Sequence, residues 1–227
     1  MIDKNAYYVD KTNLIENVLN EQNVFFTRPR RFGKTLNMSM LYYFFSIKEK
    51  ENAYLFNGLN ISKNKKAIKH QNQYPTLFIT LKDMKNSSYE KQMNRFKEII
   101  CLCAKNFLEL LDSDELLDSE KKLFQKYVDN ETEDNELERE IFNISYFLYK
   151  HYHQKVIILI DEYDVPLQSA YQNNYYDEMV DFLRSVFSSA LKTNDALEKG
   201  IMTGCLRISK ESIFTGLNNF TSYSILN

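Results

Sequence analysis

Short apolar runs alternate along the chain with longer stretches in which apolar residues recur every three or four positions. The short runs, rich in β-branched and aromatic residues, predict strands at 23–27, 75–81, 155–161, 200–205 and 222–226. The longer stretches predict helices at 9–20, 34–46, 89–111, 137–152 and 179–190. Strands that alternate with helices predict an α/β domain in which right-handed crossovers join parallel strands.

Two of these segments also predict where the core lies. The run "KVIILID" at 155–161 shows no alternation of polar and apolar residues, which is typical of a strand buried on both faces. The segment 34–46 is apolar on most sides and is expected to lie between the sheet and another layer. Its apolar residues at helical spacing are Leu36, Met40, Leu41, Phe44 and Phe45. The acidic stretch 112–136 is expected to be a partly helical surface excursion.

Composition narrows the class of protein. The chain has 227 residues, of which 44% are hydrophobic and 14% aromatic, enough for one α/β core. A formal net charge of -2 excludes a generally basic, nucleic-acid-binding character. Three cysteines without paired spacing indicate neither a disulfide framework nor a zinc site and fit a reducing cytoplasm. With no long apolar run, no membrane partner is expected.

No helix follows the last predicted strand, so we expect the chain to be one module of a longer protein.

The segment between the first strand and the next helix resembles a phosphate-binding loop. Such loops follow the pattern G-x-x-x-x-G-K-[ST], in which backbone amides and a helix N-terminus converge on an anion. Here the register gives "RPRRFGKT", so Gly33, Lys34 and Thr35 are present and Arg28 replaces the first glycine. Pro29 fixes its own φ and favours an extended Arg28, so the chain can still turn there. The loop is therefore predicted to be altered at its start and intact where it meets phosphate.

A second motif favours nucleotide binding over a chance match. The run "VIILIDEYD" ends in Asp161 and Glu162; in nucleotide hydrolases an acid at the tip of such a strand holds Mg²⁺, and a following glutamate activates water. The alternative is a pair of surface acids after a core strand. Thr203, at the tip of a later strand, either contacts the water or γ-phosphate or is a satisfied structural threonine. Arg207 either reaches the same phosphate or another subunit, or lies on the surface.

In combination, four segments resemble a known family. "YYVDKTNLI", "TRPRRFGKTLNMSML", "VIILIDEYDVPL" and "GIMTGCLRISKESIFTGLNNF" are similar to the AAA-ATPase-like domain family of bacteria and archaea, in the P-loop NTPase superfamily. The resemblance covers Tyr7 to Leu226, and the arginine at the first loop position belongs to the family pattern. It implies a three-layer P-loop fold with strand order 5-1-4-3-2, in which an extra strand separates the two motif strands.

The resemblance also bears on the rest of the protein. Family members usually continue into a small helical region and a restriction-endonuclease-like nuclease domain. Residues 1–227 are thus expected to be the nucleotide-binding domain, truncated before those parts. Nucleic acid would be a partner only through the absent nuclease domain. The resemblance does not decide whether the protein forms a homo-oligomer.

Site roles follow from the resemblance residue by residue. Lys34 is expected to neutralise the β- and γ-phosphates of ATP from the loop tip, outside the core. Thr35 and Asp161 are expected to hold Mg²⁺, and Glu162 to act as the base. The resemblance implies further nucleotide-binding residues. Asp10 and Lys11 lie where related ATPases recognise the adenine, and Phe32 and Gly33 would contribute backbone donors. Leu36 belongs to the same set, and Arg30 and Arg31 either contact phosphate or face solvent. Thr203 and Arg207 complete the catalytic set.

Three functions fit these residues. The favoured one is a Mg²⁺-dependent ATPase module that drives a conformational change in a larger protein. The alternative is a nucleotide-dependent switch with little or no hydrolysis, favoured by the altered loop start and the lack of an assured arginine finger. A small-molecule kinase is weaker, because an Asp-Glu pair suits activation of water rather than of an acceptor hydroxyl.

Overall fold

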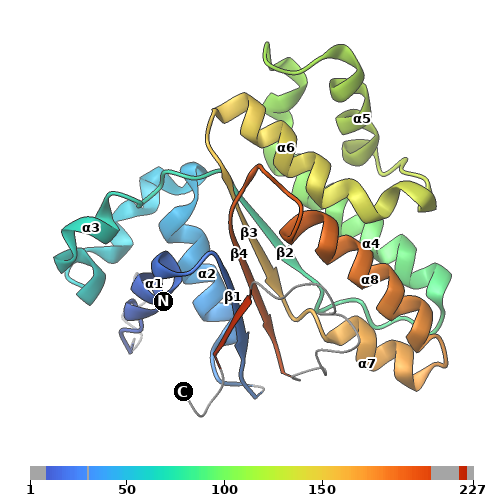
Figure 1. Cartoon of the computed structure of the whole chain (residues 1–227), viewed down its shortest axis with the longest axis horizontal. Helices are drawn as coiled ribbons and strands as arrows, with labels where there is room; N and C mark the ends of the chain where they lie inside the picture. Colours follow the sequence, from blue (N-terminus) through green and yellow to red (C-terminus); the bar gives the residue numbers. More distant parts are fainter. Residues whose placement is uncertain (1–8, 30, 206–219, 224–227) are drawn as a thin grey trace.

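A parallel sheet lies at the centre of the protein (Figure 1). The computed structural model describes residues 9–29, 31–205 and 220–223, and within these ranges the sheet has five strands in the order β2-β3-β4-β1-β5. The strands are β1 (Asn23–Thr27), β2 (Thr76–Thr80), β3 (Val156–Asp161), β4 (Leu197–Gly204) and β5 (Phe220–Tyr223). The strand β4 separates the motif strands β1 and β3, as expected, and β5 pairs with the outer side of β1. The α/β class with an all-parallel sheet is confirmed.

Helices cover both faces of the sheet (Figure 1). One face carries α1 (Asn13–Asn20), α2 (Lys34–Phe45), α3 (Lys65–Ile68) and the 3₁₀ segments η2 (Ile47–Phe56) and η3 (Asn60–Lys63). The other carries α4 (Tyr89–Ala104), α5 (Asp118–Asp129), α6 (Glu140–Tyr152), α7 (Val165–Gln172), α8 (Tyr176–Leu191) and the 3₁₀ segments η4 (Lys105–Asp112) and η5 (Asp134–Arg139).

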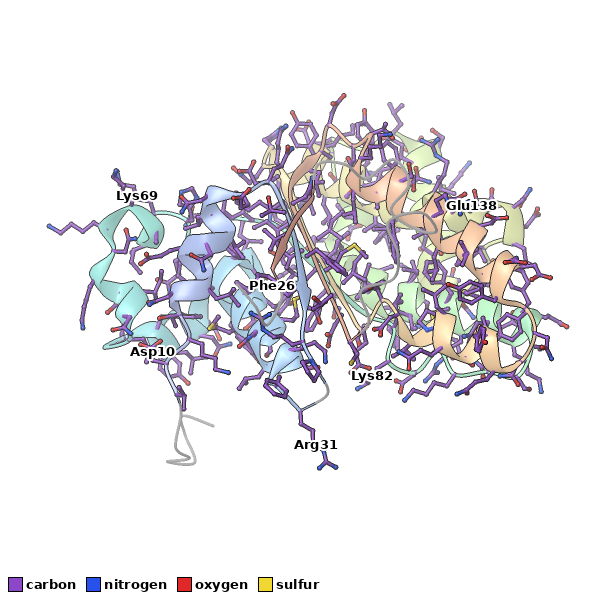
Figure 2. The ribbon with its side chains drawn as sticks, turned by 60° about the horizontal axis from the view of Figure 1, so that its bottom comes forward. Asp10, Phe26, Arg31, Lys69, Lys82 and Glu138 are labelled. Carbon is purple, nitrogen blue, oxygen red and sulfur yellow. The ribbon has the colours of Figure 1, made fainter. Side chains whose placement is uncertain are left out.

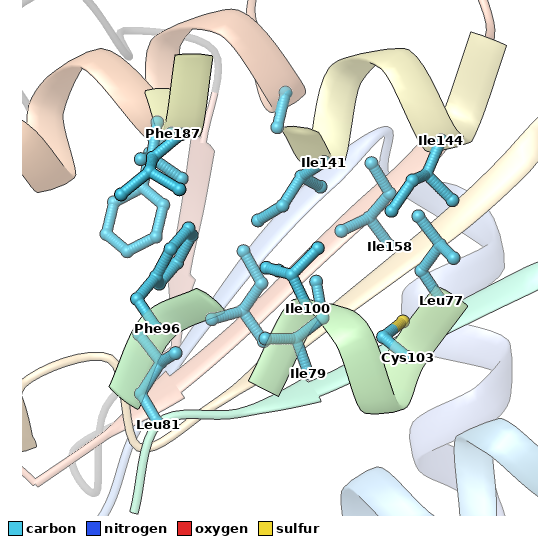
Figure 3. Packing of buried hydrophobic residues seen from close by; sticks show 14 of the residues in the cluster. Leu77, Ile79, Leu81, Phe96, Ile100, Cys103, Ile141, Ile144, Ile158 and Phe187 are labelled. Carbon is cyan, nitrogen blue, oxygen red and sulfur yellow. The ribbon is translucent and has the colours of Figure 1, made fainter. Parts of the chain in front are cut away.

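The strand β3 is buried along its whole length, as its unbroken apolar run predicted. Because successive side chains point to opposite faces, Ile158 and Ile160 pack against the layer of α4, α6 and α8, whereas Ile157 and Leu159 pack against the layer of α2. The same alternation directs the side chain of Asp161 toward α2. Figure 3 shows the first of these two cores, where α4 and α6 meet the sheet.

Several helical segments differ from expectation, three of them on the face of the sheet that carries α4. The predicted helix 89–111 ends as α4 at Ala104, because Phe107 takes non-helical dihedral angles (φ -132°, ψ 40°) within η4 and buries its ring. The acidic stretch is more than a surface excursion, since α5 buries Phe124 and Tyr127 in the main core. The helix α7 was not predicted; it has only eight residues, too few for the apolar spacing to be recognised.

Glu140, at the start of α6, is a buried carboxyl only 1% exposed. Burial raises its pKa from 4.5 to about 7, against the hydrogen bond from Thr132 and the charge of Lys97, which lower it. Between these two values the unfolded chain releases a proton that the folded protein keeps, so the free energy of unfolding falls as pH rises. The expected loss is at most about 3 kcal/mol.

Urea denaturation across that pH range checks the expectation. Glu140→Gln should flatten the decline in stability, because a neutral amide has no proton to lose. Glu138→Gln, which changes an exposed glutamate near the same helix (Figure 2), should keep the wild-type slope. Equal slopes in the two variants would show that Glu140 does not carry the pH dependence.

Candidate functional site

The carboxyl ends of β1, β3 and β4 lie at one edge of the sheet. Backbone hydrogen bonds join residues at or just beyond these ends: Arg28 N donates to Gly204 O (3.2 Å), and Tyr163 N donates to Thr203 O (3.1 Å). A Cβ on Gly204 would lie 2.2 Å from the ring of Tyr163, so only glycine allows this close approach. The carboxyl ends of β1, β3 and β4 are therefore fixed relative to one another.

The loop after β1 takes two residues into the left-handed region before α2 begins. Arg31 has φ 69° and Gly33, the N-cap of α2, has φ 76°. Gly33 adopts this conformation without the steric cost that a side chain would incur. The first hydrogen bond of the helix runs from Asn37 N to Gly33 O (2.9 Å), so the amides of residues 34–36 have no partner within the helix. Amides without a partner at a helix N-terminus are the groups from which anion-binding sites are built, and the phosphate role of this loop stays a prediction.

Lys34 lies beneath this loop. Its side chain is 8% exposed, and its Nζ donates to Arg28 O (2.9 Å) and Pro29 O (3.0 Å) and lies 3.1 Å from Cys205 Sγ. The expectation that Lys34 stands at the loop tip, outside the core, is therefore wrong. Arg28 and Pro29, at the altered start of the loop, accept hydrogen bonds from the lysine ammonium through their carbonyls and hold it in place.

Asp161 connects the first turn of α2 to β4. It is 1% exposed; its Oδ2 accepts a hydrogen bond from Thr35 Oγ1 (2.8 Å), and its Oδ1 accepts one from Thr203 Oγ1 (3.1 Å). A carboxylate with two hydroxyls is an oxygen donor set of the type Mg²⁺ prefers. The described ranges contain no group of three or more His, Cys, Asp or Glu residues able to hold a metal ion. A cation here would need further oxygen ligands from phosphate and water.

Glu162 turns the chain out of β3. It has φ 56°, and the Val165 amide donates to its carbonyl (3.1 Å). No hydrogen bond or ion pair engages its carboxylate within the part of the chain that the structure describes. Nearby, Oδ2 of the fully buried Asp164 accepts from the Cys205 amide (3.1 Å) and from Gln168 Nε2 (2.7 Å). Asp164 thus fixes the turn that presents Glu162.

A cleft of about 520 Å³ lies at this edge of the sheet. Six of its lining residues were predicted: Arg31, Gly33, Lys34, Thr35, Leu36 and Glu162. Four were not: Lys85, Val165, Gln168 and Cys205. The unpredicted residues come from the loop after β2, from α7 and from the position just after β4. The order of the strands brings Lys85 and Cys205 to the cleft, and α7 brings Val165 and Gln168. A cleft of this size is within the range of small-molecule sites.

The N-terminal segment also reaches the loop. Asp10 accepts hydrogen bonds from Thr12 N (2.9 Å), Thr12 Oγ1 (2.7 Å) and Asn60 N (2.7 Å). Burial alone would raise the pKa of Asp10, but the hydrogen bonds from Asn60 and Thr12 outweigh it and lower the pKa. Asp10 therefore anchors the segment and does not line the cleft, while Lys11 Nζ lies 3.8 Å from the position of a Cβ on Gly33. Their role in adenine recognition stays a prediction.

The remaining predicted residues differ in their placement. Arg31 borders the cleft, and Figure 2 shows its side chain directed away from the rest of the protein. The side chain of Phe32 is 56% exposed and does not line the cleft. Arg30 and Arg207 lie outside the described residues.

Fold and site together define a P-loop-like α/β domain: a parallel sheet, a Gly-Lys-Thr loop that opens α2, and an Asp-Glu pair at the end of β3. Residues 1–214 match the family described as Predicted AAA-ATPase, and the chain belongs to that family.

A curated relative extends well beyond the region that it shares with this chain. The chain is 26% identical over 224 residues to an uncharacterized protein in the vnfD 5' region of Azotobacter chroococcum mcd 1. The alignment covers 96% of this chain and 37% of that protein. No solved structure matches the chain significantly. In the described segments, every helix is too short or too polar to cross a bilayer.

Proposed function

We propose that the cleft binds ATP with Mg²⁺ and hydrolyses the γ-phosphate, and that the hydrolysis drives a conformational change in a larger protein. One observation carries the proposal: Lys34, the Thr35–Asp161–Thr203 cluster and Glu162 converge where the amides of α2 begin. Membership of a family described as Predicted AAA-ATPase supports it.

Phosphate binding is assigned to the loop and the start of α2. The amides of residues 34–36 and the positive end of the helix dipole favour an anion at this point. Lys34 adds a full positive charge, and Lys11 brings a second ammonium close to Gly33. Several positive groups held near one loop repel one another, and the phosphates of a nucleotide would relieve that repulsion.

Metal binding is assigned to Thr35 and Asp161. Their side chains are already joined by a hydrogen bond, and Thr203 holds the other carboxylate oxygen. Mg²⁺, when bound, neutralises charge on the β- and γ-phosphate oxygens. Thr35 and Asp161 offer it hard oxygen ligands, directly or through water.

Water activation is assigned to Glu162 rather than Asp161. Both oxygens of Asp161 accept hydrogen bonds from hydroxyl groups, whereas Glu162 lines the cleft. Glu162 would accept a proton from the water whose oxygen bonds to the γ-phosphorus. The bond from phosphorus to the bridging oxygen breaks, and ADP leaves with the released electron pair.

A second candidate is a switch that binds ATP and hydrolyses it very slowly. The contacts of Lys34 favour it: the carbonyls of Arg28 and Pro29 compete with phosphate for the same ammonium. In either case the partner we propose is the remainder of a larger protein, because the chain spans 37% of the length of its curated relative. A nuclease domain in that remainder stays a prediction.

Calorimetric titration with ATP and ADP, each with Mg²⁺ or with EDTA, tests the proposal. EDTA is expected to abolish hydrolysis and to weaken ATP binding more than ADP binding, because Mg²⁺ held by Thr35 and Asp161 would neutralise charge on the γ-phosphate, which ADP lacks. Thr35→Ser should keep this metal dependence and Thr35→Val should lose it. If neither ATP nor ADP binds in the presence of Mg²⁺, the cleft is not a site for these nucleotides. If hydrolysis survives complete chelation, the metal assignment is wrong.

A further inference from the structure

The loop between β2 and α4 brings a second lysine to the cleft. Lys85 lines it together with Lys34, Glu162 and Gln168. The reason is the sheet order: β2 pairs with β3, and Thr80 lies opposite Asp161. The backbone continues this pairing, since Leu81 N donates to Asp161 O (2.9 Å). The loop that carries Lys85 therefore leaves the sheet beside the Asp161–Glu162 motif.

The backbone on both sides of Lys85 is held by Gln92 of α4. This glutamine is fully buried. Its Nε2 donates to Met84 O (2.8 Å), and its Oε1 accepts from Asn86 Nδ2 (2.8 Å) and Asn86 N (3.2 Å). Met84 is itself fully buried. The residues before and after Lys85 are thus fixed, although Lys85 itself is exposed.

The opposite side of the loop is fastened to the helices that form another wall of the cleft. Asn86 O accepts hydrogen bonds from Ser169 Oγ (3.0 Å) in α7 and from the Tyr175 hydroxyl just before α8. The helix α7 also supplies Val165 and Gln168 to the cleft. The loop that carries Lys85 is therefore held on both sides by hydrogen bonds, and it places Lys85 at the same cleft as Glu162.

No described carboxylate forms an ion pair with Lys85. The nearest acid in the loop, Asp83, lies 3.6 Å from Arg95 of α4 and lines a different cavity, together with Lys82. Lys85 consequently adds positive charge to a cleft that already contains Lys34 and the N-terminus of α2. A cation that a fixed stretch of backbone carries into such a site is suited to stabilising charge that develops on an anion.

We propose that Lys85 is a catalytic residue that contacts the terminal phosphate of ATP. It would supply within one chain the positive charge that an arginine finger supplies in other nucleotide hydrolases. As the water oxygen bonds to phosphorus and the bond to ADP breaks, Glu162 takes the water proton. The Lys85 ammonium offsets the charge on the phosphoryl and leaving oxygens and transfers no proton. This inference rests on the proposed function of the cleft.

The test compares Lys85→Met with Lys82→Met, a matched change at an exposed lysine of the same loop that lines a different cavity. Methionine keeps the apolar stem and removes the charge. Lys85→Met is expected to lower kcat by about 10²–10³-fold and to weaken ATP binding more than ADP binding. Lys82→Met should match wild type, and Lys85→Arg should recover part of the rate. Turnover per chain should not change on dilution.

The outcomes separate the inference from the proposed function. If the wild-type protein binds no ATP, both fail. If it hydrolyses ATP and Lys85→Met behaves like Lys82→Met, only the role of Lys85 fails. A turnover per chain that rises with protein concentration would mean that a second chain supplies the charge, which also overturns the inference.

If wild-type turnover is too slow to measure, binding decides. A larger loss of affinity for ATP than for ADP in Lys85→Met supports the contact, and equal losses overturn it. Thermal melting of each variant checks that it folds. If Lys85→Met does not fold, Lys85→Gln takes its place in the comparison.

Discussion

Glu162→Gln is expected to bind ATP as tightly as the wild-type protein and to hydrolyse it roughly 10²–10⁴-fold more slowly. Glutamine keeps the length of the side chain and its ability to hydrogen-bond, but it cannot accept the proton of the attacking water. Binding depends on the loop amides, Lys34 and the metal ligands, none of which this substitution alters. Binding and chemistry should therefore separate at this residue.

Steady-state phosphate release and calorimetry measure the two effects. Glu178→Gln, at an exposed glutamate in the first turn of α8, serves as the control and should hydrolyse ATP at the wild-type rate. Saturating ATP should raise the melting temperature of Glu162→Gln at least as much as that of wild type, because a ligand that binds the native state stabilises it. If Glu162→Gln turns over as fast as wild type, Glu162 is not the base. If wild type and variant both bind ATP and neither hydrolyses it, the protein is a switch.

Lys34→Met is expected to weaken ATP binding roughly 10- to 100-fold or more, since hydrogen bonds to charged groups contribute about 1.5–3 kcal/mol each. The same change leaves Arg28 O and Pro29 O without their donor, so a loss of stability of about 1–3 kcal/mol is expected as well. A control must therefore reproduce the loss of stability without touching the cleft.

Lys199 provides that control. Like Lys34 it is 8% exposed, and its Nζ donates to two carbonyls, Leu19 O (3.1 Å) and Glu21 O (2.6 Å). It lies near the start of β4, away from the strand ends that form the cleft. Lys199→Met should be destabilised to a similar extent and should bind ATP normally. Equal ATP affinities in the two variants would remove the phosphate-loop assignment.

Local sequence pattern was sufficient for the parts of the site that lie within one strand, loop and helix. The strand Asn23–Thr27 begins and ends where the apolar run predicted. Gly33, Lys34 and Thr35 lie in the segment that joins it to the next helix, and Asp161 and Glu162 stand at the end of an apolar run typical of a buried strand. These residues meet because parallel strands end at the same edge of the sheet.

Pattern was insufficient where placement depends on packing. Lys85 and Gln168 reach the cleft through the pairing of β2 with β3 and through α7, a helix too short to be recognised. The burial of Lys34 depends on carbonyls that the loop presents only once it has turned at Arg31 and Gly33. Neither the bracing of the β2–α4 loop by Gln92 nor the close approach at Gly204 has a signal in the spacing of residues.

The pairing of β1 also has a consequence for the order of folding. This strand, which leads into the Gly-Lys-Thr loop, pairs only with β4 and β5 among the described strands, and its first pair joins Asn23 to Gly200. Bringing such distant segments together carries a large loop-closure cost, which slows the step that forms them. During synthesis β1 must wait for nearly the whole domain to leave the ribosome, whereas β2 can pair with β3 earlier. The Gly-Lys-Thr loop should therefore be among the last parts of the domain to take its final shape.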